Sequence, residues 1–193
     1  MRLEIFDKNQ KVSARLIAQI VRFVDGFSPD IVKVFLYRRE YFGDWFQPMF
    51  YETMRADSDW TPGERELMAA FVSYKNHCRY CTDAHRATAG QFVGDATAAA
   101  VLAAPATAPI SPKLRAILAF LEKLTIAPRD LTSEDVAVLR RADISDDAIG
   151  NATEICVQFC MINRLADTFG FRLQTPRGLA NEAKTLAKKN YKF

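Results

Sequence analysis

The chain has 193 residues, of which 49% are apolar, 25% are charged and 11% are aromatic. This composition excludes a disordered chain, which would hold fewer apolar residues and more net charge. The length suits one large domain or two small ones and suffices for a buried core. The net charge of +3, from 26 basic and 23 acidic residues, is too small and too scattered for a nucleic-acid-binding protein.

Three features predict a soluble protein of the cytoplasm. Four cysteines are too few for a disulfide-stabilised secreted scaffold. The N-terminus, Met1 to Lys8, has no continuous apolar stretch after its charge and so does not resemble a signal peptide. The most apolar run, Ala96 to Ile110, contains two prolines and is too short to cross a bilayer. We therefore expect partners other than membranes or nucleic acid.

Helix-capping patterns recur along the chain and predict an all-α fold. In chain order they are Ser28-Pro29-Asp30, Thr61-Pro62-Gly63-Glu64, Ser111-Pro112, Thr132-Ser133-Glu134-Asp135 and Ser145-Asp146-Asp147. Each pattern places a hydroxyl at the cap, followed by proline or acidic residues in the first helical turn. Glu64 adds a capping box with Thr61. Gly170 is expected to end a helix that includes Leu165 to Phe169.

Between these signals, apolar residues repeat at intervals of three and four, as at Leu114, Ile117, Leu118, Leu121 and Leu124. Few segments alternate with period two, and Asp25-Gly26 is the one hairpin-type turn. The patterns predict a single helical domain over residues 1–193, with about seven or eight helices and no sheet. The segment from Ala104 to Ser111, with two prolines, is expected to be a loop within that domain, because neither half alone has a large core.

The segment from Val34 to Tyr51 is dense in aromatic residues. Its phenylalanines at positions 35, 42, 46 and 50 are spaced by seven, four and four, which places them on one face of a continuous helix. We interpret this face as core or subunit interface, with the wall of an apolar substrate pocket as the alternative. Pro48 is expected to kink or restart the helix. Further aromatic residues, among them Trp45, flank this face, which suggests that something besides the chain's own core covers it.

Both histidines of the chain and two of its four cysteines lie between Asn76 and His85. On a helix, Cys78, Cys81 and His85 lie within about 60° of each other. If Asn76 or His77 caps that helix, Cys78 lies in its first turn, where unpaired N–H groups favour a thiolate. His85, one turn beyond Cys81, can take the proton of that cysteine. A thiolate that attacks a peroxide becomes a sulfenic acid, and a second thiol three residues away converts it to a disulfide.

Glu66 is the candidate to orient His85 or to relay its proton. It lies twelve residues before Cys78, which on a continuous helix would place it about 120° away. A shared site therefore requires a break in the helix near Asn76. The neighbouring Glu64 is occupied by the capping box, which leaves Glu66 as the better candidate.

Other interpretations of these residues compete with redox chemistry. The cysteine pair and the following histidine, with His77, could form a zinc site, but His77 adjoins Cys78 and no second Cys-x-x-Cys follows. A c-type haem is excluded, because Thr82 stands where that haem requires a histidine. Buried thiols without chemistry are the remaining alternative. Cys156 and Cys160, four residues apart in an apolar helix, are interpreted as inert core cysteines of this kind.

The spacing from Glu66 to His85 resembles the Glu-x11-Cys-x2-Cys-x3-His signature of the alkylhydroperoxidase D-like proteins, which belong to the carboxymuconolactone decarboxylase-like superfamily. Residues 76–81 also resemble the Asn-x-Cys-x-Tyr-Cys core of that superfamily, and residues 163–170 are similar to its closing helix. The resemblance covers roughly residues 53–170. It implies an all-α fold, homo-oligomers, and thiol peroxidase or disulfide reductase activity without a bound cofactor.

The resemblance also implies a role for each residue of the motif. Cys81 would be the peroxidatic cysteine and Cys78 the resolving, reductant-facing one, while Glu66 and His85 would relay a proton. The chain departs from the characterised hydroperoxidases at Tyr80, where they have an additional histidine. This departure moves the chain toward the peroxidase-related branch of the superfamily.

The resulting hypothesis is a cytoplasmic thiol-dependent peroxidase that reduces hydrogen peroxide or organic hydroperoxides at the expense of a dithiol or protein reductant. One alternative is a lyase or isomerase that acts on a carboxylated ring, with Glu66 and His85 as acid and base. The other is a redox-sensing or binding protein whose disulfide has no fast turnover. The lactone decarboxylases of the superfamily generally lack the cysteine pair, which argues against decarboxylation.

Overall fold

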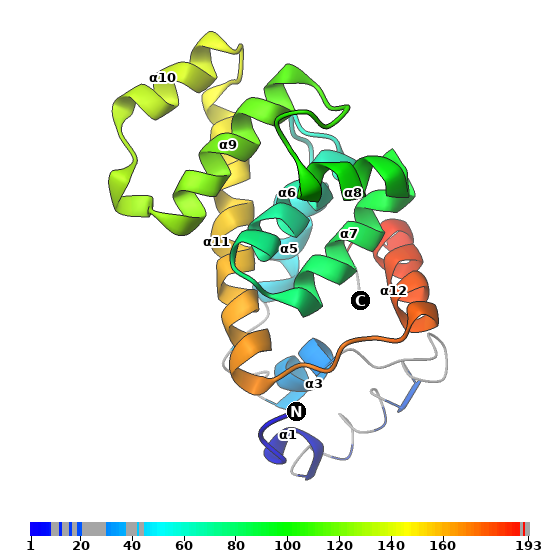
Figure 1. Cartoon of the computed structure of the whole chain (residues 1–193). Coiled ribbons are helices and arrows are strands. Elements are labelled where there is room, and N and C mark those ends of the chain that lie inside the picture. The colour runs from blue at the N-terminus through cyan, green and yellow to red at the C-terminus, as the bar shows by residue number, and fades with distance from the viewer. Residues whose placement is uncertain are drawn as a thin grey trace.

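The fold is known from a computed structural model that describes residues 1–8, 12, 16, 19–20, 30–37, 42, 45–189 and 191. Within these residues every regular element is helical, as Figure 1 shows. The predicted all-α fold class is confirmed. The cap predicted at Ser28-Pro29 and the turn at Asp25-Gly26 lie outside the described residues.

In the part of the chain that the structure describes, α1 (Ile5–Lys8) and α3 (Asp30–Tyr37) precede eight α-helices that lie between residues 46 and 189. These are α5 (Phe46–Arg55), α6 (Pro62–Lys75), α7 (Arg79–Val93), α8 (Asp95–Ala103), α9 (Pro112–Ile126), α10 (Ser133–Arg141), α11 (Asp146–Phe169) and α12 (Pro176–Lys189). A 3-10 turn, η1 (Pro128–Asp130), joins α9 to α10. Among the described helices, none combines the length and the apolar character that crossing a membrane requires.

The predicted capping residues begin and end the main helices. Thr61 accepts a hydrogen bond from the backbone N–H of Glu64, and the Glu64 carboxylate accepts one from the backbone N–H of Thr61 at 2.9 Å. Ser111 and Ser145 cap α9 and α11 by accepting hydrogen bonds from the backbone N–H groups of Leu114 and Ala148. Gly170 ends α11 with a φ of 63°, a left-handed conformation that glycine adopts without a steric penalty.

Helix α6 is the centre of the core, and it contacts α5, α7, α8, α9 and α11. Its side chains are buried on nearly all sides, including Leu67, Met68, Phe71 and Val72, which is the pattern of a helix surrounded by others. Because α6 packs against helices on both sides of the 104–111 loop, both halves of the chain share this core. Ala108 of that loop is itself buried in it.

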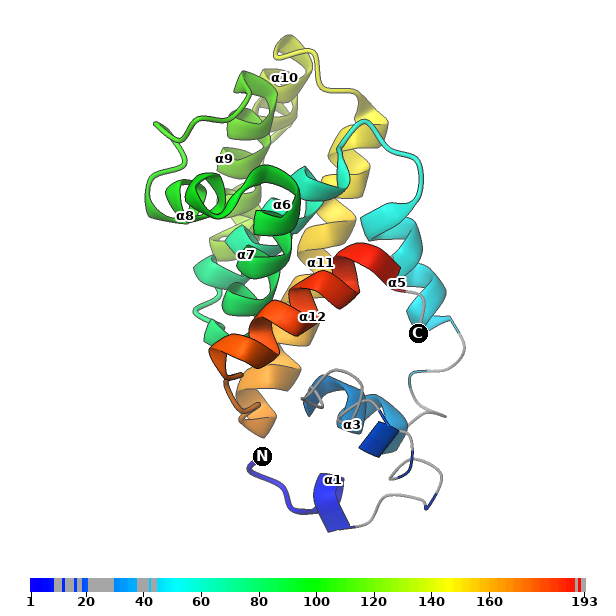
Figure 2. The same ribbon diagram turned by 90° about the vertical axis from the view of Figure 1, so that its right-hand side faces the viewer.

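Helix α12 crosses α7, as Figure 2 shows, and Tyr191, which follows it, packs against Phe50 of α5. At the opposite end of the fold, the N-terminal helices are tied to the segment that follows α11. The buried carboxylate of Asp30 accepts hydrogen bonds from the Arg172 side chain at 2.6 Å and from its backbone N–H at 2.9 Å. These contacts attach α3 to the segment that follows α11.

The expected continuous helix through the aromatic segment is wrong, because α3 ends at Tyr37 and a separate helix, α5, begins at Phe46. Pro48 lies in the first turn of α5, where its missing N–H costs nothing, so the predicted restart is confirmed. The rings nevertheless pack together. Phe46 lies 4.3 Å from Phe35 and 4.9 Å from Phe50, measured between ring centroids. The aromatic cluster therefore forms by tertiary packing of two helices.

Candidate active site

A sharp turn between α6 and α7 produces the break near Asn76 that a shared site requires. Helix α6 ends at Lys75, and His77 has a φ of 59°, a left-handed backbone that is uncommon for a residue with a side chain. The turn is closed by a hydrogen bond from the backbone N–H of Cys78 to the carbonyl oxygen of Ser73 at 3.0 Å. Helix α7 therefore runs back along α6, which brings His85 of α7 against Glu66 of α6.

Cys78 occupies the cap position of α7 and not its first turn, which corrects the expectation from the sequence. Cys81 is the cysteine in the first turn, where the helix N-terminus favours negative charge. Both thiols are free and buried, with exposed fractions of 0% for Cys78 and 2% for Cys81. The hydrogen bond that Cys81 shares with Cys78, together with burial, raises the pKa of Cys81 well above its usual value. Ionisation of Cys81 therefore requires a base.

His85, one helical turn beyond Cys81 on α7, forms a buried pair with Glu66. Nδ1 of His85 lies 2.7 Å from Oε2 of Glu66, whose side chain is completely buried. Since an ionised carboxylate accepts hydrogen bonds only, Nδ1 carries the proton, and Nε2 is the atom free to accept another. The His85 ring packs edge-on against Phe159 of α11, with the centroids 4.4 Å apart, which fixes the plane of the imidazole.

Two residues that the sequence analysis did not single out complete this cluster. Nη2 of Arg55 donates to Oε1 of Glu66 at 2.5 Å, and the hydroxyl of Tyr191 donates to the same oxygen at 2.9 Å. The guanidinium of Arg55 also lies over the Tyr191 ring, 4.7 Å from its centroid. No local signal marks either residue, because Arg55 belongs to α5 and Tyr191 arrives from beyond α12.

These contacts decide the charge of Glu66. Burial by itself would raise the pKa of Glu66, but the hydrogen bond and charge of His85, and then those of Arg55, outweigh it and hold this pKa below its usual value. Burial and the neighbouring Glu66 charge raise the pKa of Tyr191, so its hydroxyl remains a donor. An ionised Glu66 with both oxygens occupied is suited to orient His85, and less suited to accept a proton itself.

Tyr191→Phe tests whether the end of the chain supports this cluster. We expect the variant to lose about 0.5–1.5 kcal/mol of unfolding free energy, because one buried hydrogen bond disappears while the ring stays over Arg55. Urea denaturation measures the change. The control is Tyr74→Phe, since Tyr74 is 47% exposed. Equal effects of the two substitutions would show that the Tyr191 hydroxyl contributes nothing specific.

A polar network between α6 and α11 holds the cysteine turn in place. The side-chain amide of Asn76 donates to Oδ1 of Asn163 at 2.9 Å and to Sγ of Cys160 at 3.3 Å. Asn163 in turn donates to the Ser73 hydroxyl at 3.0 Å, and its hydrogen bond to Cys81 opposes the rise in the pKa of that thiol. Both asparagines were part of the resemblance, and their shared function in fixing this turn appears only in the structure.

The part of the chain that the structure describes contains no group of three or more His, Cys, Asp or Glu side chains placed to hold one metal ion. His77, the additional ligand considered for zinc, lines a separate surface hollow of about 310 Å³ together with Tyr74, Arg79, Thr82 and Asp83. The residues proposed as site residues do not line that hollow.

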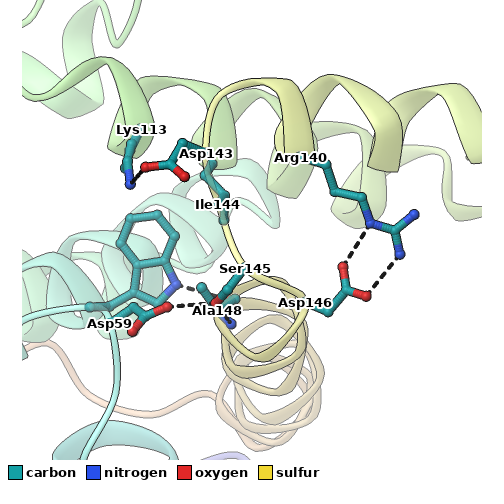
Figure 3. Close-up of a pocket in the computed structure, with 9 residues that line it drawn as sticks. Asp59, Lys113, Arg140, Asp143, Ile144, Ser145, Asp146 and Ala148 are labelled. Atoms are coloured by element: carbon teal, nitrogen blue, oxygen red, sulfur yellow. Dashed lines mark hydrogen bonds and ion pairs between the residues drawn. The ribbon is translucent and has the colours of Figure 1, made fainter.

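A larger hollow of about 620 Å³ lies around the start of α11 and is drawn in Figure 3. Four of its charged side chains pair with one another, with Lys113 2.6 Å from Asp143 and Arg140 2.8 Å from Asp146, while Asp59 accepts a hydrogen bond from the Ser145 hydroxyl. Neither the cysteine pair nor the Glu66–His85 pair contributes to its wall. The candidate active site is therefore the buried cluster at the start of α7.

Comparison with known proteins gives matches of two kinds. Residues 40–123 match the carboxymuconolactone decarboxylase family. An uncharacterized peroxidase-related protein from Silicibacter sp. TM1040 has a similar structure, with a TM-score of 0.78 and 24% identity over 92% of this chain and 93% of that one. A second, from Ralstonia eutropha JMP134, is described as an alkylhydroperoxidase AhpD core and has a TM-score of 0.74 and 26% identity over 90% and 92% of the two chains. No curated protein matches the chain.

The helical fold is similar to the one described as an alkylhydroperoxidase AhpD core. The matched segment contains all four residues of the motif, although it ends before the closing helix at residues 163–170. The resemblance drawn from the sequence is confirmed: residues 40–123 match the carboxymuconolactone decarboxylase family, and the fold is similar to that of the two peroxidase-related proteins.

Proposed function

We propose that the chain is a thiol-dependent peroxidase that reduces hydrogen peroxide or organic hydroperoxides. The observation that carries this proposal is the His85–Glu66 hydrogen bond, 2.7 Å long, one helical turn from Cys81. Residues four apart on a helix have Cβ atoms about 5–6 Å apart, within reach of proton transfer between their side chains. The descriptions of the two structural relatives as peroxidase-related proteins agree with this function.

In the proposed reaction, Nε2 of His85 accepts the proton of the Cys81 thiol. The thiolate attacks one peroxide oxygen, so that an S–O bond forms, the O–O bond breaks, and the departing hydroxide or alkoxide takes the proton from His85. Cys78 then attacks the sulfenic acid, which forms the Cys78–Cys81 disulfide and releases water. An external dithiol or protein reductant restores both thiols by thiol–disulfide exchange.

Because the pKa of Cys81 is raised, the proposed reaction needs His85 as a base to ionise this thiol. A thiol that shares a hydrogen bond with Cys78 and is shielded from water ionises rarely on its own. Glu66 keeps His85 in the tautomer that can accept the proton, and Arg55 keeps Glu66 ionised. We place the reaction in the cytoplasm, where thiols such as the four free cysteines of this chain are kept reduced.

Peroxide consumption in the presence of a dithiol tests the proposal. We expect catalytic consumption, and mass spectrometry after one equivalent of peroxide should show that the thiols of Cys78 and Cys81 are lost together. A protein that consumes no peroxide but forms the disulfide slowly would be a redox sensor instead. If Cys78→Ser turns over a lactone while wild type ignores peroxide, the lyase alternative is favoured.

We also propose that the protein forms a homo-oligomer, most simply a dimer, with a trimer or hexamer as wider possibilities. The rings of Phe35, Phe46 and Phe50 cover part of one another's surface. Trp45, which packs beside Phe46 at the start of α5, is 55% exposed. Apolar surface of this kind is a common component of subunit interfaces. Light scattering at micromolar concentration should give a multiple of 21.8 kDa. A mass near that of one chain would contradict the proposal.

A further inference from the structure

A second pair of thiols lies on α11, and Asn76 connects it to the turn that carries the proposed catalytic cysteines. Cys156 and Cys160 are one helical turn apart, and their Sγ atoms are separated by 3.9 Å. The sequence interpretation of an inert core thiol suits Cys156, which is 2% exposed and lies 3.4 Å from the Thr125 hydroxyl. It does not suit Cys160, because this residue is partly exposed.

Several polar groups surround the sulfur of Cys160. The Asn76 amide donates to Sγ at 3.3 Å, and the Cys156 thiol faces the same atom. Arg164 follows one turn later and donates from Nη1 to the Cys160 carbonyl oxygen at 2.8 Å, which keeps its positive charge close to the thiol. Hydrogen-bond donors and a cation around one sulfur are the environment in which cysteines become reactive thiolates.

The electrostatic consequences agree with this geometry. The Cys156 hydrogen bond, opposed by burial and assisted by Asn76 and Arg164, lowers the pKa of Cys160 to about 6. The same contact with Cys160, together with burial, raises the pKa of Cys156, so that Cys156 remains a protonated donor. The two thiols therefore act as one thiolate and one supporting S–H group.

We propose that Cys160 is a reactive thiol that forms mixed disulfides with small disulfides such as oxidised glutathione. In this reaction the Cys160 thiolate attacks one sulfur of the small disulfide. A new S–S bond forms to Cys160, the original S–S bond breaks, and the leaving thiolate takes a proton from solvent. This site is distinct from Cys78 and Cys81, and the proposal does not depend on peroxidase activity.

We expect oxidised glutathione to react with Cys160 before the other cysteines, and the exposure of Cys160 contributes more to this preference than the ionisation of its thiol. At pH 7 the lowered pKa raises the thiolate fraction from about 3% to about 90%, but the weaker nucleophilicity of a less basic thiolate cancels most of this gain, which leaves a few-fold advantage. The other three cysteines are only 0–2% exposed. A disulfide reagent can reach them only when the structure opens locally.

The mixed disulfide should persist, since Cys156 is poorly placed to displace it. Residues four apart on a helix hold their Cβ atoms about 5–6 Å apart, whereas a disulfide requires about 3.5–4.5 Å. An intrahelical Cys156–Cys160 disulfide would therefore distort α11. We expect one glutathione to remain attached to Cys160 after the reaction.

The experiment treats the reduced full-length protein with oxidised glutathione, quenches with acid and maps the adduct by peptide mass spectrometry. Trypsin cleaves after Arg79, which separates Cys78 from Cys81, and fragmentation of the peptide that contains Cys156 and Cys160 distinguishes those two. We expect the first adduct on Cys160. It should be absent from Cys160→Ser and unchanged in rate in the Cys78→Ser/Cys81→Ser variant, which has lost the proposed peroxidase site.

Arg164→Gln tests the charge contribution without removing a cysteine. It should slow adduct formation by no more than about two-fold at pH 6 and not at pH 8, where the thiol ionises in either protein, because Arg164 lowers the pKa of Cys160 less than Cys156 and Asn76 do. Arg129→Gln, at an exposed arginine in η1, is the matched control and should leave the rate unchanged. A first adduct on Cys78 or Cys81, or equal labelling of Cys156 and Cys160, would overturn the proposal.

Discussion

Cys81→Ser is expected to abolish enzyme-dependent peroxide reduction. Cys81 is the cysteine in the first turn of α7, and it alone has an imidazole, that of His85, one helical turn further along. A serine hydroxyl at this position has no accessible anion and cannot form a sulfenic acid. Stopped-flow measurement of peroxide consumption, with a dithiol in excess, should give the rate of buffer alone.

Cys78→Ser should have the complementary effect. Cys81 should still react with one equivalent of peroxide, but the sulfenic acid should then persist, because the resolving thiol is missing. Dimedone labelling followed by peptide mapping identifies the trapped residue. Both variants are best made with Cys160→Ser, so that this partly exposed thiol does not contribute labelling.

The buried Cys156 provides a matched control for these substitutions, since Cys156→Ser changes a thiol that is 2% exposed, as Cys81 is, but lies outside the motif. It should retain the wild-type rate of peroxide reduction. If dimedone labels Cys78 in Cys81→Ser at the wild-type rate, the two cysteines have the opposite roles.

Glu66→Gln is the second substitution with a large expected effect, and it should change both rate and stability. Loss of the orienting carboxylate should lower the peroxide rate by about 10²–10⁴-fold, the usual worth of general acid–base help. The fold should be weakened too, because the Arg55 side chain is only 2% exposed and would lose its counter-charge. Breaking a buried pair in this way costs about 3–5 kcal/mol.

The double variant Arg55→Met/Glu66→Gln separates the two effects. Methionine keeps an apolar stem between the Tyr191 and Phe92 rings, which the Arg55 guanidinium contacts in the wild type. Urea unfolding should show most of the lost stability restored, while the peroxide rate stays low. Recovery of the rate together with stability would mean that Glu66 is structural and has no part in proton transfer.

Acid denaturation provides an independent readout of the same carboxylate. The pKa of Glu66 is lowered in the folded protein, so its contribution to stability is complete above its unfolded pKa of about 4.3. This contribution is lost as the pH falls through the lower pKa of the folded state. Wild type should therefore lose more unfolding free energy between pH 7 and pH 3 than the double variant does.

Local sequence patterns determined the helices and the grouping of the motif. A hydroxyl followed by proline or acidic residues satisfies the first N–H groups of a helix wherever it occurs, which is why Thr61 and Ser111 mark helix starts without knowledge of the fold. In the same way, the spacing of Cys81 and His85 places them one turn apart on any helix. On a continuous helix Glu66 and Cys78 would lie about 120° apart, so a shared site required a break before α7.

Only the tertiary structure decided which distant groups meet. Tyr191 donates to Glu66 from 125 residues away, and Cys160 meets Asn76 across 84 residues. No periodicity or cap encodes such contacts, because they depend on how α11 and α12 pack against α6 and α7. The exposure of Cys160 was unpredictable for the same reason: an apolar helix indicates which residues can be buried, and the packing of its neighbours decides which of them are covered.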